Sequence, residues 1–165
     1  MTVETEIRVA TSDDVSAICK FGRDVVRPHY EPIVGREHAL AQVGQWWSES
    51  YLRQAVKAQL VIVADAAGEV VGVAQRGRSG ADDVIYKLYV RPAERGHGLG
   101  PRLIAAIVEQ LPANADRVWV EQLAANTRAA AFYQREGFIV ERVEPSASGD
   151  ARTARVWYSR AIKRR

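Results

Sequence analysis

Apolar residues recur along the chain at two spacings, one typical of strands and one typical of helices. An unbroken apolar run at residues 60–64 predicts a buried strand. Alternating or apolar runs predict further strands at residues 7–9, 70–76, 83–90, 117–123, 138–143 and 153–159. Helical spacing predicts helices at about residues 13–26, from about residue 36 through Trp47, and at residues 49–57, 102–111 and 126–136. This order predicts one α/β domain with a mixed sheet, in which residues 84–123 form a parallel strand–helix–strand unit between antiparallel hairpins.

Proline and glycine mark the expected breaks between these elements. Pro28 is expected to end the first helix, because the residue before a proline avoids the helical region. Residues 27–35 are therefore predicted to form a loop, which carries His29, Tyr30 and Glu31 between two prolines. Turns are expected at residues 65–68 and 77–80, and a longer loop at residues 145–150.

Composition narrows the class of protein. The 165 residues, 47% hydrophobic and 26% charged, fit one globular domain spanning residues 1–165. The net charge of +3 is mild, and the basic residues 160–165 are expected to form a solvated end rather than a nucleic-acid-binding arm. The single cysteine, Cys19, excludes an internal disulfide and is expected in the core. No apolar run approaches the ~20 residues that span a membrane, and the acidic start is unlike a secretory signal, so we expect a cytoplasmic protein without a membrane partner.

The most informative stretch is the glycine turn, residues 95–100, which lies between a predicted strand and a predicted helix. The first amides of a helix lack intrahelical partners and attract anions, so this turn predicts a phosphate site. A Walker A loop would need a lysine after the last glycine, but Pro101 follows Gly100. The dinucleotide-binding fingerprint would need a third glycine where Pro101 stands. It also starts directly after a strand, whereas residues 91–95 intervene here. Glu121 would mimic the ribose-binding acid of that fold, but too little chain surrounds these residues to form a full dinucleotide-binding fold.

Two motifs together resemble those of the GNAT superfamily of acetyl-coenzyme A-dependent N-acetyltransferases. The first is R-x-x-G-x-G, read as Arg95-Gly96-His97-Gly98-Leu99-Gly100, after the strand Tyr86-Lys-Leu-Tyr-Val-Arg-Pro92. The second is N-x-x-A-x-x-x-Y-x-x-x-G-F, matched at Asn126, Ala129, Tyr133, Gly137 and Phe138. The resemblance implies a single-domain GNAT-like α/β fold. Its mixed, mostly antiparallel sheet of about seven strands is flanked by helices, and strands four and five are splayed apart.

The resemblance also implies a site for acetyl-coenzyme A, used as co-substrate without a metal. The pyrophosphate would bind Arg95, Gly96, His97, Gly98, Leu99 and Gly100, and the pantetheine arm would bind the main chain of Leu88, Tyr89 and Val90 and the side chain of Asn126. Arg95 as a surface charge and Asn126 as a plain helix cap are the alternative interpretations. Pro101 departs from the family pattern by removing one amide near the phosphates.

Acetyl transfer to an amine needs two proton movements, and the resemblance suggests groups for both. Tyr133 matches the general acid that protonates the leaving thiolate; a buried structural tyrosine is the alternative. Glu121 is the candidate base, against an ordinary strand-end carboxylate. His29, Tyr30 and Glu31 are candidates for binding the acceptor, although a loop histidine often has only a structural role.

We therefore expect an N-acetyltransferase that acts by direct attack of a primary amine. The acceptor is expected to be a small molecule rather than a protein amine. A non-catalytic acyl-coenzyme A sensor is the alternative function. We expect no nucleic-acid partner and either a monomer or a homodimer.

Overall fold

The computed structural model describes residues 3–163. The chain divides into two compact units, which are described separately here. The N-terminal unit comprises Met1–Gln75 and Lys87–Ile107, and the C-terminal unit comprises Arg76–Tyr86 and Val108–Arg165.

Seven strands form one mixed sheet in the order β1-β2-β3-β4-β5-β7-β6, which confirms the predicted α/β class. The strands are β1 (Thr5–Val9), β2 (Val61–Ala66), β3 (Glu69–Ser79), β4 (Asp82–Val90), β5 (Arg117–Leu123), β6 (Ile139–Glu144) and β7 (Arg155–Ala161). The α-helices are α1 (Val15–Phe21), α2 (Arg27–Val34), α3 (Arg36–Trp46), α4 (Glu49–Lys57), α5 (Leu99–Glu109) and α6 (Thr127–Arg135). Shorter helical turns lie at Ser12–Asp14, Gly22–Val26, Pro92–Glu94 and Ala151–Thr153.

Strands β4 and β5 run parallel, as the predicted strand–helix–strand unit requires. Their pairing joins Val84 to Trp119 and Ile85 to Val120, although β4 continues to Val90. By contrast, β5 pairs with β7 along its whole length, from Arg117 to Leu123.

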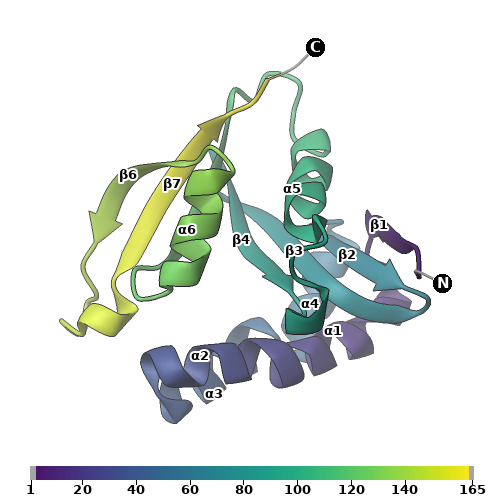
Figure 1. Ribbon diagram of the computed structural model, residues 1–165, viewed down its shortest axis with the longest axis horizontal. Coiled ribbons are helices and arrows are strands. Elements are labelled where there is room, and N and C mark those ends of the chain that lie inside the picture. Colours follow the sequence, from purple (N-terminus) through teal and green to yellow (C-terminus); the bar gives the residue numbers. More distant parts are fainter. Residues whose placement is uncertain (1–2, 164–165) are drawn as a thin grey trace. The chain divides into compact units, whose positions relative to one another are not determined.

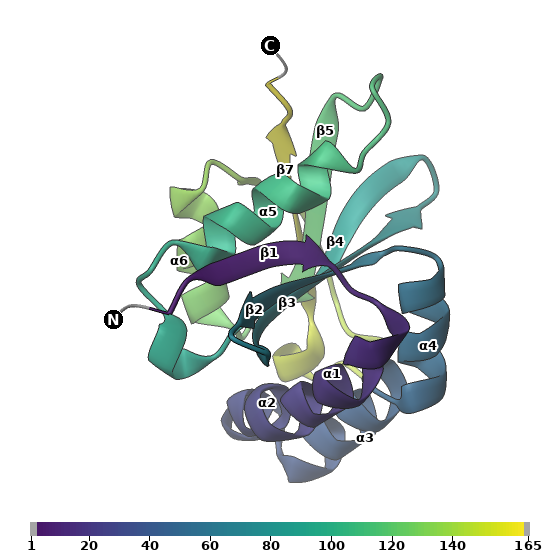
Figure 2. The same ribbon diagram turned by 90° about the vertical axis from the view of Figure 1, so that its right-hand side faces the viewer.

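In the N-terminal unit, helices cover both faces of the sheet. Figure 2 shows α1–α4 on one side of β1–β3 and α5 on the other. This cover explains why Val61, Ile62, Val63 and Ala64 are all buried, since a strand between two helical layers has no solvent face. Side chains from both layers, such as Phe21 of α1 and Leu103 of α5, complete the core.

In the C-terminal unit, helix α6 packs against β7 (Figure 1). Val118 and Val120 of β5 are buried and alternate with half-buried neighbours, whereas residues 156–159 of β7, Tyr158 among them, are all buried. Tyr133 of α6 packs on Tyr158, with ring centroids 6.0 Å apart. Strand β6 pairs with β7 and is exposed along its length.

The loop predicted at residues 27–35 is wrong, because Arg27–Val34 is helix α2. Pro28 lies at the start of α2, a position where proline is tolerated. The π-helical turn Gly22–Val26 carries the chain into α2, and Gly35, with φ +87°, ends it. His29, Tyr30 and Glu31 are therefore held on a helix.

Three other boundaries differ from the predictions. Strand β3 continues through the predicted turn at residues 77–80 to Ser79, and Gly80, with φ +60°, makes the turn. Helix α5 begins at Leu99 rather than residue 102 and ends at Glu109, because Pro101 is tolerated in a first turn. Leu88 and Val90, near the end of β4, are half-buried.

Candidate functional site

The glycine turn of the N-terminal unit has left-handed backbone at two of its glycines. Gly96 and Gly98 have φ values of +82° and +78°, a left-handed region that costs other residues about 1–2 kcal/mol. A Cβ atom at either position would meet nothing within 4 Å. Glycine is therefore needed here for its backbone conformation and not because neighbouring atoms crowd the position.

The turn leads directly into α5. The amide of Arg102 donates to the carbonyl of Gly98 at 3.3 Å, and Pro101 occupies the first turn. The amides at this helix start point away from the intrahelical ladder, and no side chain at Gly96 or Gly98 shields them. This open backbone, beside the exposed His97, fits a phosphate group.

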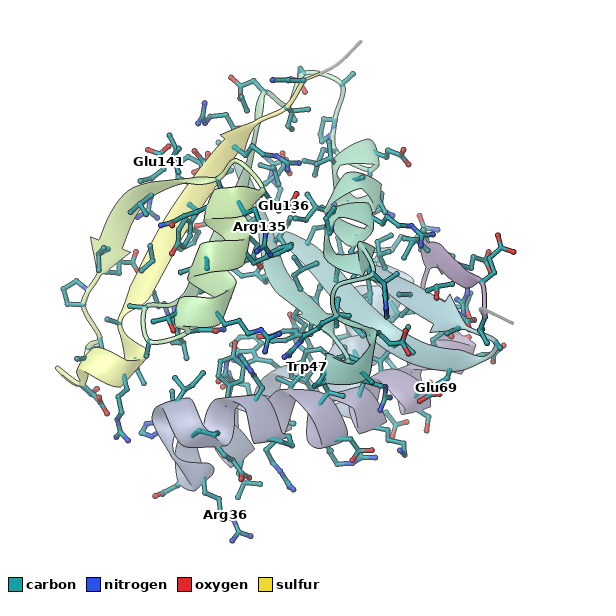
Figure 3. All side chains as sticks on the ribbon, in the orientation of Figure 1. Arg36, Trp47, Glu69, Arg135, Glu136 and Glu141 are labelled. Carbon is teal, nitrogen blue, oxygen red and sulfur yellow. The ribbon has the colours of Figure 1, made fainter. Side chains whose placement is uncertain are left out.

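The sequence analysis missed a buried amine on β4. Lys87 is 5% exposed, and its Nζ donates to Oε1 of Gln75 at 2.6 Å and to the carbonyl of Trp46 at 2.7 Å. The same Nζ lies 4.8 Å from the ring centre of Trp47, labelled in Figure 3, and 4.5 Å from that of Tyr51. Two oxygen acceptors and two aromatic faces thus enclose the lysine.

No ion pair to Lys87 is found within residues 3–163, so the groups around this amine are uncharged. Nε2 of Gln75 donates to the Tyr51 hydroxyl at 2.8 Å, which turns the amide oxygen toward Lys87. Trp46 is the last residue of α3, where the negative end of the helix dipole favours a cation. Burial nevertheless lowers the pKa of Lys87 to about 7. Side chains alternate between the two faces of β4, so Lys87 shares a face with Ile85 and Tyr89. This alternation was the one feature of the sequence that indicated a buried position for Lys87.

Two of the predicted binding residues meet in the N-terminal unit. The hydroxyl groups of Tyr30 on α2 and Tyr89 on β4 are hydrogen-bonded at 2.5 Å. The ring of Tyr89 also packs edge-on against Trp47, with centroids 5.6 Å apart. His29 packs edge-on against Tyr30 at 5.1 Å, whereas Glu31 pairs with Arg27 along the helix at 3.4 Å. Of the three predicted acceptor residues, Tyr30 is thus linked directly to a predicted cofactor residue.

Asn126 and Tyr133 belong to α6 of the C-terminal unit. Oδ1 of Asn126 accepts a hydrogen bond from the amide of Ala129 at 3.3 Å, so the predicted N-cap is confirmed. Tyr133 lies one turn beyond Ala129 and is buried against Phe138 and Tyr158, with centroids 5.5 and 6.0 Å away. The capped helix therefore fixes the phenol ring on the sheet.

Glu121 lies near the end of β5, also in the C-terminal unit. Its Oε1 is 3.2 Å from Nε of Arg155 on β7, and its side chain is 16% exposed. Burial raises the pKa of Glu121, and this effect outweighs the opposing influence of Arg155. A recessed carboxylate whose proton affinity is raised in this way suits a proton acceptor.

Cys19 is buried, and burial raises the pKa of its thiol, which makes it a poor nucleophile. Within residues 3–163 no three histidine, cysteine or acidic side chains are grouped so as to hold a metal ion. None of the helices in this part of the chain is both long and apolar enough to cross a membrane.

Comparison with known proteins identifies the family. A family model described as an acetyltransferase (GNAT) domain matches residues 57–140, about half of the chain. The chain belongs to the GNAT acetyltransferase family. The matched region contains the glycine turn and both Asn126 and Tyr133, so both motifs noted in the sequence fall inside it.

Similar proteins include two enzymes named L-methionine sulfoximine/L-methionine sulfone acetyltransferase, from Pseudomonas paraeruginosa and Pseudomonas aeruginosa. Each is 31% identical to this chain over 107 residues, a match that spans 61% of this chain and 61% of the relative. Among solved structures, the PaiA N-acetyltransferase of Thermoplasma acidophilum in complex with coenzyme A has a TM-score of 0.78 at 16% identity, covering 96% of this chain and 99% of that one. A GCN5-related N-acetyltransferase from Rhodopseudomonas palustris also has a TM-score of 0.78, at 21% identity, with coverages of 98% and 99%. These structures share the GNAT fold.

Proposed function

We propose that this chain transfers the acetyl group of acetyl-coenzyme A to a primary amine by direct attack on the thioester carbonyl. Membership of the GNAT acetyltransferase family supports the reaction class. The observation that carries the proposal is the glycine turn, because Gly96 and Gly98 hold left-handed backbone with no atoms crowding them. This is the backbone that a pyrophosphate needs for close approach to amides.

Residues of each unit have a role in binding acetyl-coenzyme A in this proposal. In the N-terminal unit, the side chains of Arg95 and His97 and the amides of residues 96–100 bind the pyrophosphate. The main chain of Leu88, Tyr89 and Val90 binds the pantetheine arm. In the C-terminal unit, Asn126 adds a contact to pantetheine while it caps α6.

The proton transfers involve Tyr133 and Glu121. The amine gives its proton to Glu121, the new C–N bond forms as the C–S bond breaks, and Tyr133 gives its proton to the leaving thiolate. An alkylamine has a pKa of ~10 and a thiol a pKa of ~8.5, so both transfers help at neutral pH. The raised pKa of Glu121 supports its part as the proton acceptor.

We propose a small molecule as the acceptor, with His29, Tyr30 and Glu31 contributing to its binding. The two Pseudomonas relatives are named for action on L-methionine sulfoximine and L-methionine sulfone, which are small amino-acid derivatives with a primary amine. It stays a prediction that residues 1–165 form a single acetyltransferase domain. The cytoplasmic location and the state as a monomer or homodimer also stay predictions.

The test is a panel of small amines incubated with the purified protein and acetyl-coenzyme A, with thiol release as the readout. We expect saturable release that depends on the amine. Binding of coenzyme A, seen as a thermal shift, without amine-dependent release from any member would favour the acyl-coenzyme A sensor instead.

A further inference from the structure

One face of the C-terminal sheet carries charged side chains around a tryptophan. Glu121 of β5 lies opposite Trp157 of β7, and Leu123 lies opposite Arg155. On the other side of β7, Arg142 of β6 lies opposite Trp157. Directly paired residues of antiparallel strands point to the same face, so Glu121, Arg155, Trp157 and Arg142 share one face.

The opposite face of this sheet is the one that packs on α6. Tyr158 lies between Trp157 and Ser159 in β7 and therefore points the other way, where its ring meets Tyr133 at 6.0 Å. Gln122, the neighbour of Glu121, donates to the Tyr158 hydroxyl at 3.2 Å. The charged face is thus distinct from the face that α6 covers.

The charged side chains on this face differ in how far they are exposed to solvent. Glu121 is recessed, at 16% exposure, whereas Arg155 is 53% exposed and touches Glu121 through Nε at 3.2 Å. Its two Nη groups have no partner among residues 3–163. Arg142 stacks over the Trp157 ring at 4.5 Å and lies 3.7 Å from Glu144. A carboxylate at the base and two guanidinium groups above it can meet both signs of charge on one ligand.

Trp157 adds an unsatisfied hydrogen-bond donor. The residue is 6% exposed, and its Nε1 is buried without a hydrogen-bond partner in the described structure. Leaving such a donor unpaired costs about 1–3 kcal/mol, so native structures seldom keep one without a reason. An acceptor atom of a bound molecule would provide the missing partner.

We infer that this face binds the acetyl acceptor as an α-amino acid or close analogue, with its amine at Glu121 and its carboxylate at Arg155 and Arg142. The inference rests on the proposed acetyltransferase function. Glu121 and Arg155 are in contact, so a ligand that binds both must carry its positive and its negative charge close together. This requirement sets the substrate class. An α-amino acid carries its amine and carboxylate on one carbon, whereas a plain amine offers no carboxylate to either arginine.

The binding mode is consistent with the transfer step. The amine proton passes to Glu121, the nitrogen bonds to the acetyl carbon, and the thiolate leaves with the proton of Tyr133. Arg155 and Arg142 take no part in bond making, and they orient the amine by holding the neighbouring carboxylate. Arg155 is therefore a specificity residue, and its removal should act on acceptors that carry a carboxylate.

The experiment compares amino acids with the amines that lack the carboxylate. The probes are L-phenylalanine with phenethylamine, and L-leucine with isopentylamine. For Arg155→Met we expect kcat/KM toward the amino acids to fall about 10–100-fold, the loss of one charged hydrogen-bonded contact. The ratio of kcat/KM for each amino acid to that for its paired amine should fall at least about 10-fold, because any effect of Arg155 on Glu121 acts on both classes alike, and Arg155→Lys should recover part of this selectivity.

Arg152→Met is the matched control, since Arg152 is 54% exposed and pairs with Asp150 at 2.8 Å outside this face. It removes the same charge and should leave both classes of acceptor unaffected. An Arg155→Met loss that is equal for amino acids and amines, or absent for both, would overturn the inference while the transferase function stands. If the wild type acetylates neither class, the proposed function fails and the inference fails with it.

Discussion

Each unit of the protein contains a titratable side chain whose pKa is shifted by burial, Lys87 in one and Glu121 in the other, and the surroundings of the two side chains differ. Lys87 in the N-terminal unit is enclosed by the oxygens of Gln75 and Trp46 and by two aromatic rings. Glu121 in the C-terminal unit is only recessed, and its partner Arg155 reaches solvent. Burial moves the pKa of both toward the neutral form, downward for Lys87 and upward for Glu121.

The comparison teaches that a shifted pKa does not by itself mark a catalytic group. Lys87 is 5% exposed, and its Nζ is already engaged by two protein oxygens and two aromatic rings. It connects the end of α3 with β3 and β4 and holds Trp47 against Tyr89. Glu121 combines a similar shift with access to solvent, so it can exchange a proton with a ligand.

The largest expected effect is on stability. Lys87→Ala leaves a cavity and two oxygens, of Gln75 and Trp46, without their donor. We expect the free energy of unfolding to fall by about 3 kcal/mol, measured by urea denaturation. Lys20→Ala is the control, because Lys20 is exposed and its ion pair with Asp24 is a surface pair worth little. Equal losses for the two variants would show that the cage around Lys87 does not stabilise the fold.

Glu121→Gln should lower the activity of the enzyme rather than its stability. We expect kcat to fall about 10²-fold, as for loss of a general base, while the unfolding free energy changes little. In the wild type, activity should decline as the pH falls through the pKa of Glu121, which burial raises above the usual range of a glutamate. Glu49→Gln, at an exposed ion pair on α4, is the control for charge removal. An acid limb that is unchanged in Glu121→Gln would exclude Glu121 as the base.

The burial of Lys87 also predicts how stability depends on pH. Its folded-state pKa of about 7 lies below its ordinary value of 10.5, so between these values the unfolded chain binds the extra proton. The stability of the wild type relative to Lys87→Met should therefore rise with pH across this window, by at most about 1.4 kcal/mol per pH unit. Below about pH 7 the difference should be constant. A difference that is flat up to pH 10 would mean that the amine stays charged in the folded state.

Asn126→Ala gives the smallest effect. Removing the side chain that accepts from Ala129 should lower the unfolding free energy by about 1 kcal/mol. If Asn126 also contacts pantetheine, as proposed, the affinity for coenzyme A falls too, which calorimetry would detect. Asn126→Asp keeps the cap, so a loss of affinity with normal stability would separate the two roles.

The parts of the fold that could be predicted depend on local sequence. The cap at Asn126, the left-handed glycines of the turn and the buried run in β2 follow from residues within one turn or strand. The helix at Arg27–Val34 was missed because the proline rule was applied without regard to position in the first turn.

The contacts around Lys87 could not be predicted for a different reason. Its acceptors lie 12 and 41 residues away in the chain, so burial of the amine depends on tertiary packing. Arg155 likewise meets Glu121 only through the pairing of β5 with β7. For the same reason, motifs located the glycine turn, Asn126 and Tyr133, but not the charged face beside them.

The most direct test of the central claim compares thiol release by the wild type and Tyr133→Phe at saturating acetyl-coenzyme A and amine. The account predicts that Tyr133→Phe binds coenzyme A with unchanged affinity and releases thiol about 10²-fold more slowly, because the ring stays packed on Tyr158 while the proton donor is lost. Equal turnover by the two proteins would contradict Tyr133 as the general acid, and absence of amine-dependent release from the wild type would contradict the transferase itself.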